Sequence, residues 1–293
     1  MTILPHHILP QEDGRTVRDV LTYRFHISTT LRKQLKRRIG SILLNGKPAT
    51  VAQTVHTGDF LQVDVSDHAP TNAIPPVDYP LDILWEDDYL LAINKPAGIV
   101  VHGAELTVET VTIAGAVANY LHTSIFHAVN RLDRGTTGVM LIAKSGYMHG
   151  RCMDLLHTDS LYREYRAVCE GVPSPAAGQI DLPIARDESS LVRRMTAPEG
   201  AEAHTRYEVL EAANNRALVR LLPQTGRTHQ LRVHMAAIGH PLTGDWLYGV
   251  EDHSLITRPA LHSYILHFVH PLTEEVVNIA APLPEDMAKL LGK

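Results

Sequence analysis

The sequence predicts an α+β protein with a mixed, mainly antiparallel central sheet, flanking helices and a cleft, preceded by a small N-terminal α+β module. Three observations indicate this fold class. Short strand-like runs in the second part of the chain do not alternate regularly with helices, as a doubly wound sheet requires. A proline-rich stretch divides the 293 residues into a short and a long block. Apolar residues make up 44% of the chain, enough for a sizeable core.

Residues 1–66 are expected to form the small module. Ser28 is a candidate cap for an amphipathic helix, and Gly40 is expected to end that helix. The apolar stripe of this helix consists of Leu31, Leu35 and Ile39. A strand over residues 42–44 with an asparagine-glycine turn, and a second strand over residues 60–65, complete the expected α+β pattern.

Residues 67–80 are predicted to be a semi-extended linker, and residues 81–293 a second domain. The prolines of the linker are Pro70, Pro75, Pro76 and Pro80. Strands of the second domain are expected over residues 90–94, 139–143, 165–169, 207–210, 217–222 and 264–268, and helices over 145–157 and 228–238.

The composition restricts the function. The chain carries 27 Lys and Arg against 32 Asp and Glu, a net charge of −5, which excludes a uniformly basic coat for nucleic acid but permits local basic patches. Two cysteines provide neither a disulfide framework nor a structural zinc pattern. Without an apolar signal core or a run of roughly 20 apolar residues, a soluble, cytoplasmic protein with no membrane partner is expected. A monomer is the default expectation.

The segment 130–138 carries the densest group of reactive side chains. Asp133 lies between Arg131 and Arg134 on a turn that leads into the apolar strand over residues 139–143. A buried strand start fixes a carboxylate, and a neighbouring guanidinium favours its ionised form, so the side chain can act as a nucleophile or as an electrostatic stabiliser. The alternative is a turn with a purely structural Asp–Arg pair.

The segment 226–234 predicts a turn into a helix. Arg227 and Arg232, together with the amides at the helix start, suit a phosphate or carboxylate partner, although a solvated helix face explains them equally well. His229 and His234 are five residues apart, which does not place two zinc ligands on one helical face, so no metal is expected.

Tyr165 lies in a predicted strand between small residues. Ala167 and Cys169 share its face of the strand, which leaves room for a flat ligand ring against the tyrosine. The alternative is ordinary half-buried packing in a sheet.

Taken together, these segments resemble the RluA-type pseudouridine synthases over residues 90–268. Four motifs in the family's order carry the resemblance: Asn94-Lys95-Pro96-Ala97-Gly98, Arg131-Leu132-Asp133-Arg134 with Thr137-Gly138, Tyr165 with Ala167, and Gly226 to His234 followed by Gly239-His240-Pro241. The chain departs from the family pattern at three positions, Asn130, Gly135 and Thr137. These departures leave the aspartate, tyrosine and arginines in place and concern substrate choice.

The resemblance implies that uridine within an RNA chain is converted to pseudouridine without a cofactor. It assigns the catalytic aspartate to Asp133, which attacks the sugar or the base or assists elimination. It further implies that Tyr165 stacks on the uracil and handles a proton at the sugar. Arg232 is expected to pair with Asp133, and Arg131 to fill the gap left by the extruded base.

Residues 13–66 resemble a small RNA-binding domain first seen in a ribosomal protein of the small subunit, which favours large-subunit ribosomal RNA as the partner, with transfer RNA as the other possibility. Phosphate contacts are expected from Arg32, Lys33, Lys36, Arg37, Arg38 and Arg227, with Arg193 and Arg194 as helpers. Two other function classes compete: a catalytically silent RNA-binding factor for ribosome assembly, and a glycoside hydrolase, which needs a second carboxylate opposite the first.

Overall fold

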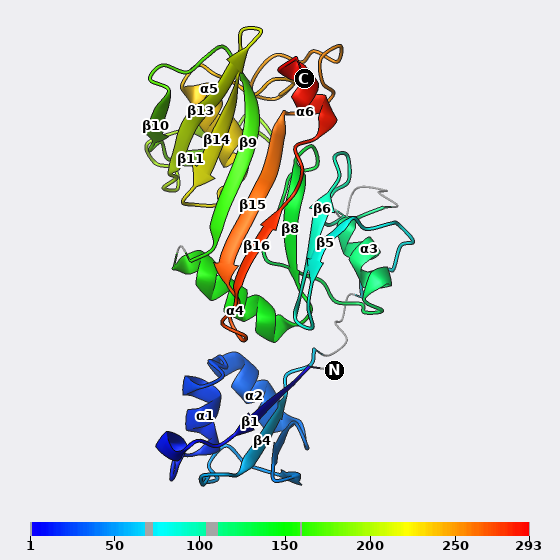
Figure 1. Ribbon diagram of the computed structural model, residues 1–293, viewed down its shortest axis with the longest axis vertical. Coiled ribbons are helices and arrows are strands. Elements are labelled where there is room, and N and C mark those ends of the chain that lie inside the picture. The colour runs from blue at the N-terminus through cyan, green and yellow to red at the C-terminus, as the bar shows by residue number, and fades with distance from the viewer. Residues whose placement is uncertain (1, 68–72, 104–110, 159, 293) are drawn as a thin grey trace.

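The computed structural model describes residues 2–67, 73–103, 111–158 and 160–292. Figure 1 shows a small N-terminal body and a larger body built on one long twisted sheet. The mixed α+β fold class predicted from the sequence is confirmed. No helix in the described part of the chain is long and apolar enough to cross a membrane.

The N-terminal body is a four-stranded antiparallel sheet with helices packed on it. The strands follow the order β1-β4-β2-β3. They are β1 (Ile3–His7), β2 (Ile42–Leu44), β3 (Lys47–Pro48) and β4 (Phe60–Asp64), and the helices are α1 (Val17–Tyr23) and α2 (Thr29–Arg37), with a short 3₁₀ turn, η1 (Pro10–Glu12). Neither β1 nor α1 was expected from the sequence.

The expected helix of this body is present as α2, but it is shorter than its predicted apolar stripe indicated. Ser28 caps α2 by accepting the Leu31 N–H, as expected, and Leu35 is buried. The helix ends at Arg37, so Ile39 falls beyond it and is 99% exposed; its place in the stripe was wrong. Helical periodicity stops at the last helical residue, whatever apolar residue follows.

The larger body carries the site. Its strands follow the order β10-β13-β14-β9-β15-β8-β6-β5, with β16 beside β15 and β7 beside β8. They are β5 (Ile83–Glu86), β6 (Leu90–Lys95), β7 (His127–Ala128), β8 (Thr137–Ala143), β9 (Tyr162–Glu170), β10 (Ala177–Ile180), β13 (Thr205–Ala213), β14 (Arg216–Pro223), β15 (Leu261–Val269) and β16 (Val276–Ala280). Each of the six predicted strands is confirmed within a longer observed one. A separate hairpin joins β11 (Ile184–Arg186) to β12 (Arg194–Thr196).

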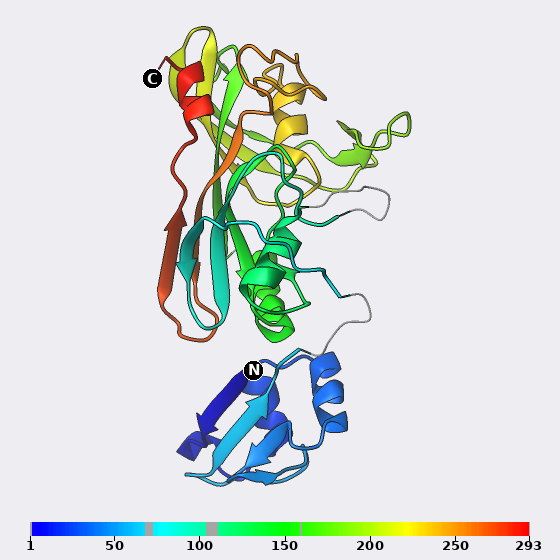
Figure 2. The same cartoon turned by 90° about the vertical axis from the view of Figure 1, so that its right-hand side faces the viewer.

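Four helices accompany this sheet: α3 (Ile113–Tyr120), α4 (Gly146–His157), α5 (Gln230–Ala237) and α6 (Glu285–Leu290). Figure 2 shows α3, α5 and the β11–β12 hairpin on one side of the sheet. The predicted helix over 228–238 begins later than expected, at Gln230, because His229 adopts a left-handed conformation.

Strand β8 runs through the middle of the core. All seven of its residues are buried, with Met140 and Ile142 in the cluster that also holds α3 and α5 residues. The alternate residues of β8, Val139, Leu141 and Ala143, pack with α4 in a second cluster. This double burial explains the continuous apolar run in the sequence and fixes the turn that precedes the strand.

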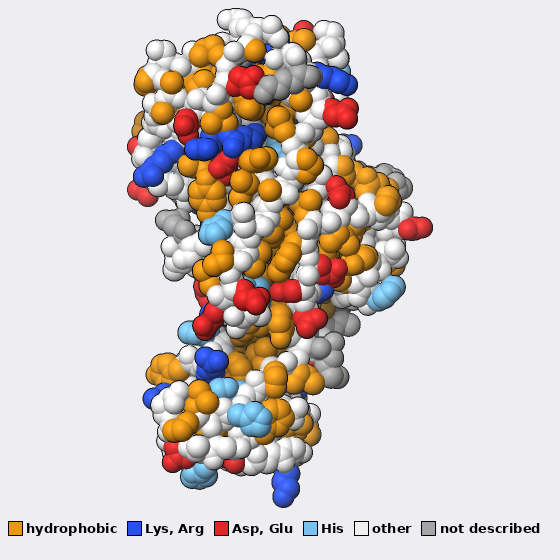
Figure 3. All heavy atoms as spheres, in the orientation of Figure 1, with side chains coloured by type: hydrophobic (Ala, Val, Ile, Leu, Met, Phe, Trp, Pro, Cys, Tyr) orange, Lys and Arg blue, Asp and Glu red, His pale blue; other side chains and the backbone are white. Residues whose placement is uncertain are grey.

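The two faces of β9 differ in chemistry. Tyr165 packs in the cluster that includes α5, and alternation places its neighbours Glu164 and Arg166 on the opposite face. These two form an ion pair of 2.6 Å. Figure 3 shows the face of the molecule that Figure 1 turns to the viewer, where a band of charged side chains crosses apolar ones. The site described below lies on the Tyr165 side of the sheet.

The two bodies touch where α4 begins. The hydroxyl of Tyr147 donates to the carbonyl of Phe25 over 2.7 Å, and the Tyr147 ring packs in the N-terminal core. Of the expected linker, residues 73–80 contain no helix or strand, and Val77 N–H donates to the carbonyl of Gly115. Pro70 lies outside the described residues.

Candidate functional site

A cavity of about 710 Å³ opens in the larger body. Its size suits a drug-sized ligand or part of a larger one. Asp133, Arg131, His229 and Arg232 line it. Two rim side chains, Val192 and Trp246, are 51% and 55% exposed. The cavity thus combines a polar floor with an apolar rim.

The turn that carries Asp133 is held by a buried lysine. The Lys95 ammonium, at the end of β6, donates to the carbonyls of Pro96, Arg134 and Thr136 at 2.8, 3.3 and 3.1 Å. Thr136 N–H also donates to the carbonyl of Asp133 over 3.1 Å. The segment 94–98 therefore contributes to the site by fixing the turn, a role that its sequence did not indicate.

Two further residues fix the start of β8. Asn130 donates to the carbonyl of Val139 and accepts from the Leu141 N–H, so its side chain replaces part of a strand ladder. Gly138 has φ +105, and a Cβ there would lie 2.1 Å from the carbonyl oxygen of Ser263 on β15. Only glycine permits this close approach of β8 and β15.

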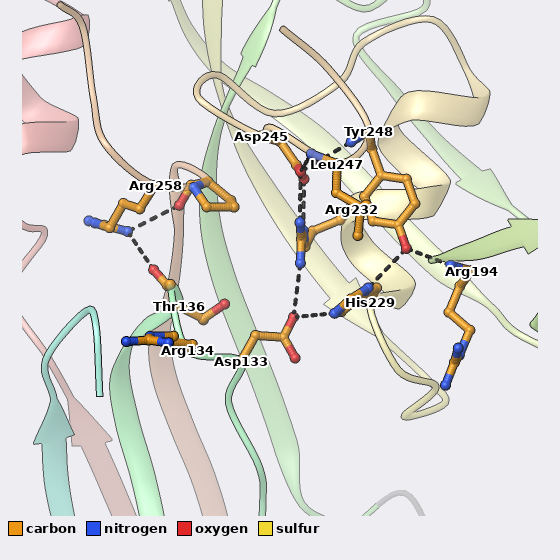
Figure 4. Close-up of polar contacts among 12 residues, drawn as sticks. Asp133, Arg134, Thr136, Arg194, His229, Arg232, Asp245, Leu247, Tyr248 and Arg258 are labelled. Carbon is orange, nitrogen blue, oxygen red and sulfur yellow. Dashed lines mark hydrogen bonds and ion pairs between the residues drawn. The ribbon is translucent and has the colours of Figure 1, made fainter. Parts of the chain in front are cut away.

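The carboxylate of Asp133 faces a guanidinium, as expected. The distance from Oδ2 of Asp133 to NH1 of Arg232 is 3.6 Å. A closer pair lies behind it: Nε and NH2 of Arg232 each donate to Asp245 over 2.7 Å. Figure 4 shows Arg232 between the two carboxylates. The arginine is thus oriented by Asp245 and presents its remaining nitrogen to Asp133.

This pairing stabilises the charge on Arg232. Burial disfavours the cation, but the hydrogen bonds that Arg232 donates to Asp245 and the charges of Asp245 and Asp133 outweigh burial and raise the pKa of Arg232 above its usual value. The ring of Tyr248 lies 5.0 Å from the guanidinium carbon, a cation–π contact. The sequence analysis assigned no role to Asp245 or Tyr248.

His229 is the second group facing Asp133. As the residue before α5 it has φ 59 and ψ 13, a left-handed conformation that costs a non-glycine residue about 1 kcal/mol. Its Nε2 lies 3.7 Å from Oδ2 of Asp133, and its Nδ1 lies 2.9 Å from the Tyr248 hydroxyl. The unusual backbone points the imidazole into the cavity. The sequence had raised His229 only as a zinc ligand; among the described residues, no group of three or more His, Cys, Asp or Glu side chains could hold a metal ion.

The remaining predicted residues lie in different surroundings. Tyr165 is 8% exposed and packs in the core; burial raises the pKa of its hydroxyl, and the nearby Asp133 charge adds to the effect. Arg131 is exposed on the cavity wall. Arg227 is exposed and donates to the carbonyl of Glu202. Of the phosphate or carboxylate partner expected for Arg227 and Arg232, the structure gives Arg232 the carboxylates of Asp133 and Asp245.

The basic residues of the N-terminal body divide into two groups. Lys33, Lys36 and Arg37 are exposed. Arg38 is engaged within the body, where NH2 lies 2.8 Å from Oδ2 of Asp64, and Arg32 donates to the Thr22 hydroxyl over 2.6 Å. Three of the five side chains are therefore free of a fixed intramolecular role in the described structure.

Comparison with known proteins gives concordant results. The family described as RNA pseudouridylate synthase matches residues 89–237. An uncharacterized RNA pseudouridine synthase of Bacillus subtilis is 37% identical over 277 residues, covering 90% of this chain and 94% of the relative. Ribosomal large subunit pseudouridine synthase D of Vibrio parahaemolyticus is 35% identical over 270 residues, covering 86% and 82%. The solved structure of human RNA pseudouridylate synthase domain containing 4 has a TM-score of 0.59 and 29% identity, covering 72% of this chain and 92% of that one.

Proposed function

Because the chain belongs to the RNA pseudouridylate synthase family and is an RNA pseudouridine synthase, we propose that it isomerises particular uridines in structured RNA with Asp133 as the catalytic carboxylate. The observation that carries this assignment is the Asp133 carboxylate, held at the floor of an open cavity 3.6 Å from a buried guanidinium. A fixed charge in such a place stabilises charge that develops in a transition state without reorganising.

The reaction balances within the substrate. The bond between N1 of uracil and C1′ of ribose breaks, a bond between C5 and C1′ forms, and the proton lost from C5 is matched by the proton gained at N1. No oxidant or group donor takes part, so we propose a reaction without a cofactor. Asp133 attacks the sugar or the base, or assists elimination.

The other residues have supporting roles in this proposal. The exposed Arg131 fills the space in the RNA stack from which the target base is extruded, which offsets part of an unstacking cost of a few kcal/mol. Tyr165 stacks on the uracil and exchanges a proton at the sugar. Its ring is buried in the core, and the charge of Asp133 lies near enough to raise the pKa of its hydroxyl.

We propose large-subunit ribosomal RNA as the substrate. The name of the Vibrio relative supports this choice, as does the basic helix α2, whose exposed Lys33, Lys36 and Arg37 suit phosphate contacts. Transfer RNA is the competing substrate that the experiment below separates.

The test uses total RNA from cells that lack the gene. After incubation with the full chain, pseudouridine is mapped by chemical derivatisation and sequencing. New sites in large-subunit ribosomal RNA are expected, and Asp133→Asn lowers their rate of formation by at least about 10³-fold. Glu251→Gln, which changes an exposed carboxylate, is the control and retains the wild-type rate. Conversion confined to transfer RNA overturns the proposal that ribosomal RNA is the substrate. An active Asp133→Asn enzyme overturns the assignment of Asp133 as the catalytic residue.

A further inference from the structure

The hydrogen bonds around Tyr248 define which nitrogen of His229 carries its proton. The backbone N–H of Arg194, on β12, donates to the Tyr248 oxygen over 2.8 Å. The same oxygen lies 2.9 Å from Nδ1 of His229. The hydroxyl has one hydrogen, and of these two partners only Nδ1 can accept it. Tyr248 is therefore the donor and Nδ1 the acceptor.

A neutral imidazole has a single N–H, so the proton of His229 is on Nε2. This nitrogen faces Oδ2 of Asp133 at 3.7 Å. The opposite tautomer would leave the tyrosine hydrogen without either partner and turn a lone pair of Nε2 towards a carboxylate. Both arguments select the same tautomer.

Burial keeps the imidazole of His229 neutral. Burial is the main cause that lowers the pKa of His229, and the cations Arg232 on α5 and Arg194 on β12 lower it further. Asp133, on the turn before β8, and Asp245, on the loop after α5, act in the opposite direction, but the pKa remains below its usual value. At neutral pH His229 is thus an N–H donor without a charge.

Both donors meet on the same oxygen of Asp133. Figure 4 shows the contacts from Arg232 and His229 converging on Oδ2, while the second oxygen points away from them. The separations of 3.6 and 3.7 Å exceed a hydrogen bond, and such contacts in ligand-free enzymes shorten when the substrate binds. The carboxylate is thereby oriented about one oxygen.

We propose that His229 and Tyr248 form a positioning pair that holds Oδ2 of Asp133 and presents Oδ1 to the RNA. This inference rests on the proposed role of Asp133. The pair explains why a non-glycine residue adopts the left-handed conformation before α5. It also connects the β11–β12 hairpin to the reacting carboxylate through the Arg194 N–H.

The tautomer is measured directly by ¹⁵N–¹H correlation spectra of the full chain labelled at histidine. The signals that disappear in His229→Gln belong to His229. A protonated Nε2 with an unprotonated Nδ1 at pH 7 is expected in the wild type, and a mixture of tautomers in Tyr248→Phe. A proton on Nδ1, or on both nitrogens, in the wild type overturns the proposal.

Kinetics test the positioning role. In single-turnover reactions on saturating RNA, Tyr248→Phe is expected to slow conversion about tenfold with an unchanged dissociation constant for RNA. His229→Leu is expected to slow conversion about 100-fold, whereas His229→Gln, which keeps a side-chain N–H, recovers at least tenfold over His229→Leu. His267→Gln, on an exposed part of β15, is the matched control and retains the wild-type rate.

Equal rates in His229→Gln and His229→Leu, or a Tyr248→Phe rate within twofold of wild type, overturn the proposal. A failure of the proposed function is distinguishable from a failure of this inference. A wild-type chain that makes no pseudouridine in any RNA rejects the catalytic assignment, whereas the tautomer of His229 is measured without substrate.

Discussion

Asp245→Asn is expected to destabilise the larger body through Arg232. The side chains of Arg232 and Asp245 are 5% and 0% exposed and form two hydrogen bonds of 2.7 Å. The substitution keeps the shape of the side chain but removes its charge. A buried guanidinium then loses its closest counter-charge, and an amide can accept only one of the two hydrogen bonds.

The magnitude follows from burial. Removing one partner of a buried ion pair costs about 3–5 kcal/mol. The Asp133 carboxylate, 3.6 Å from NH1 of Arg232, leaves the arginine with some compensation, so the lower end, about 3 kcal/mol, is expected. For a body of this size that loss corresponds to about 6–12 °C in melting temperature. The exposed pair Glu251–His253, 54% and 65% exposed, gives the control: Glu251→Gln should cost less than about 1 kcal/mol.

Urea unfolding followed by tryptophan fluorescence measures this difference, because both tryptophans, Trp85 and Trp246, lie in the larger body. The midpoint should fall for Asp245→Asn at an unchanged slope against urea. Adding Asp133→Asn should lower stability by more than the sum of the single effects, since Arg232 then lacks both carboxylates. A free energy of unfolding for Asp245→Asn that equals that of Glu251→Gln refutes this reasoning.

Two further predictions concern pH and salt. Burial lowers the pKa of His262 to about 4, below the value of about 6.5 in the unfolded chain. Between these two pH values the unfolded state therefore binds more protons than the folded state. The free energy of unfolding is expected to fall by up to about 3 kcal/mol as the pH drops from about 6.5 to 4. Unfolding of His262→Asn at stepped pH should show a shallower fall; parallel curves contradict the assignment. Replacing Lys33, Lys36 and Arg37 by glutamine should reduce the slope of log affinity for RNA against log salt by about 2–3. Arg38→Gln, which breaks an internal ion pair, should leave that slope unchanged, and equal slopes in all variants exclude α2 as an RNA contact.

The sequence predicted those helices, strands and turns whose positions depend on residues close together in the chain. The strand over residues 42–44 and the turn after it appear as expected, because Asn45 and Gly46 both adopt the positive φ that such a turn needs. Helix α1 was missed because seven residues give too short a periodic signal. Ile39 misled the prediction because an apolar residue after a helix end is indistinguishable in sequence from one inside the helix.

The sequence motifs and the family resemblance predicted part of the candidate site. The proximity of Arg232 to Asp133 was expected and is present. Asp245 was missed because its partner lies 13 residues away and only the fold joins them. His229 was missed because a histidine gives no sequence signal for a left-handed backbone. Residues that act by tertiary contact with another site residue therefore escaped detection.

The close approach at Gly138 has a consequence for how such enzymes diversify. Because β8 and β15 are in backbone contact there, the reactive floor is assembled before any RNA arrives and tolerates little variation. We expect discrimination among target sequences to involve rim side chains such as Val192 and Trp246, which line the cavity and are exposed. New specificities can arise by exchanging these contacts while the isomerisation machinery below is inherited intact.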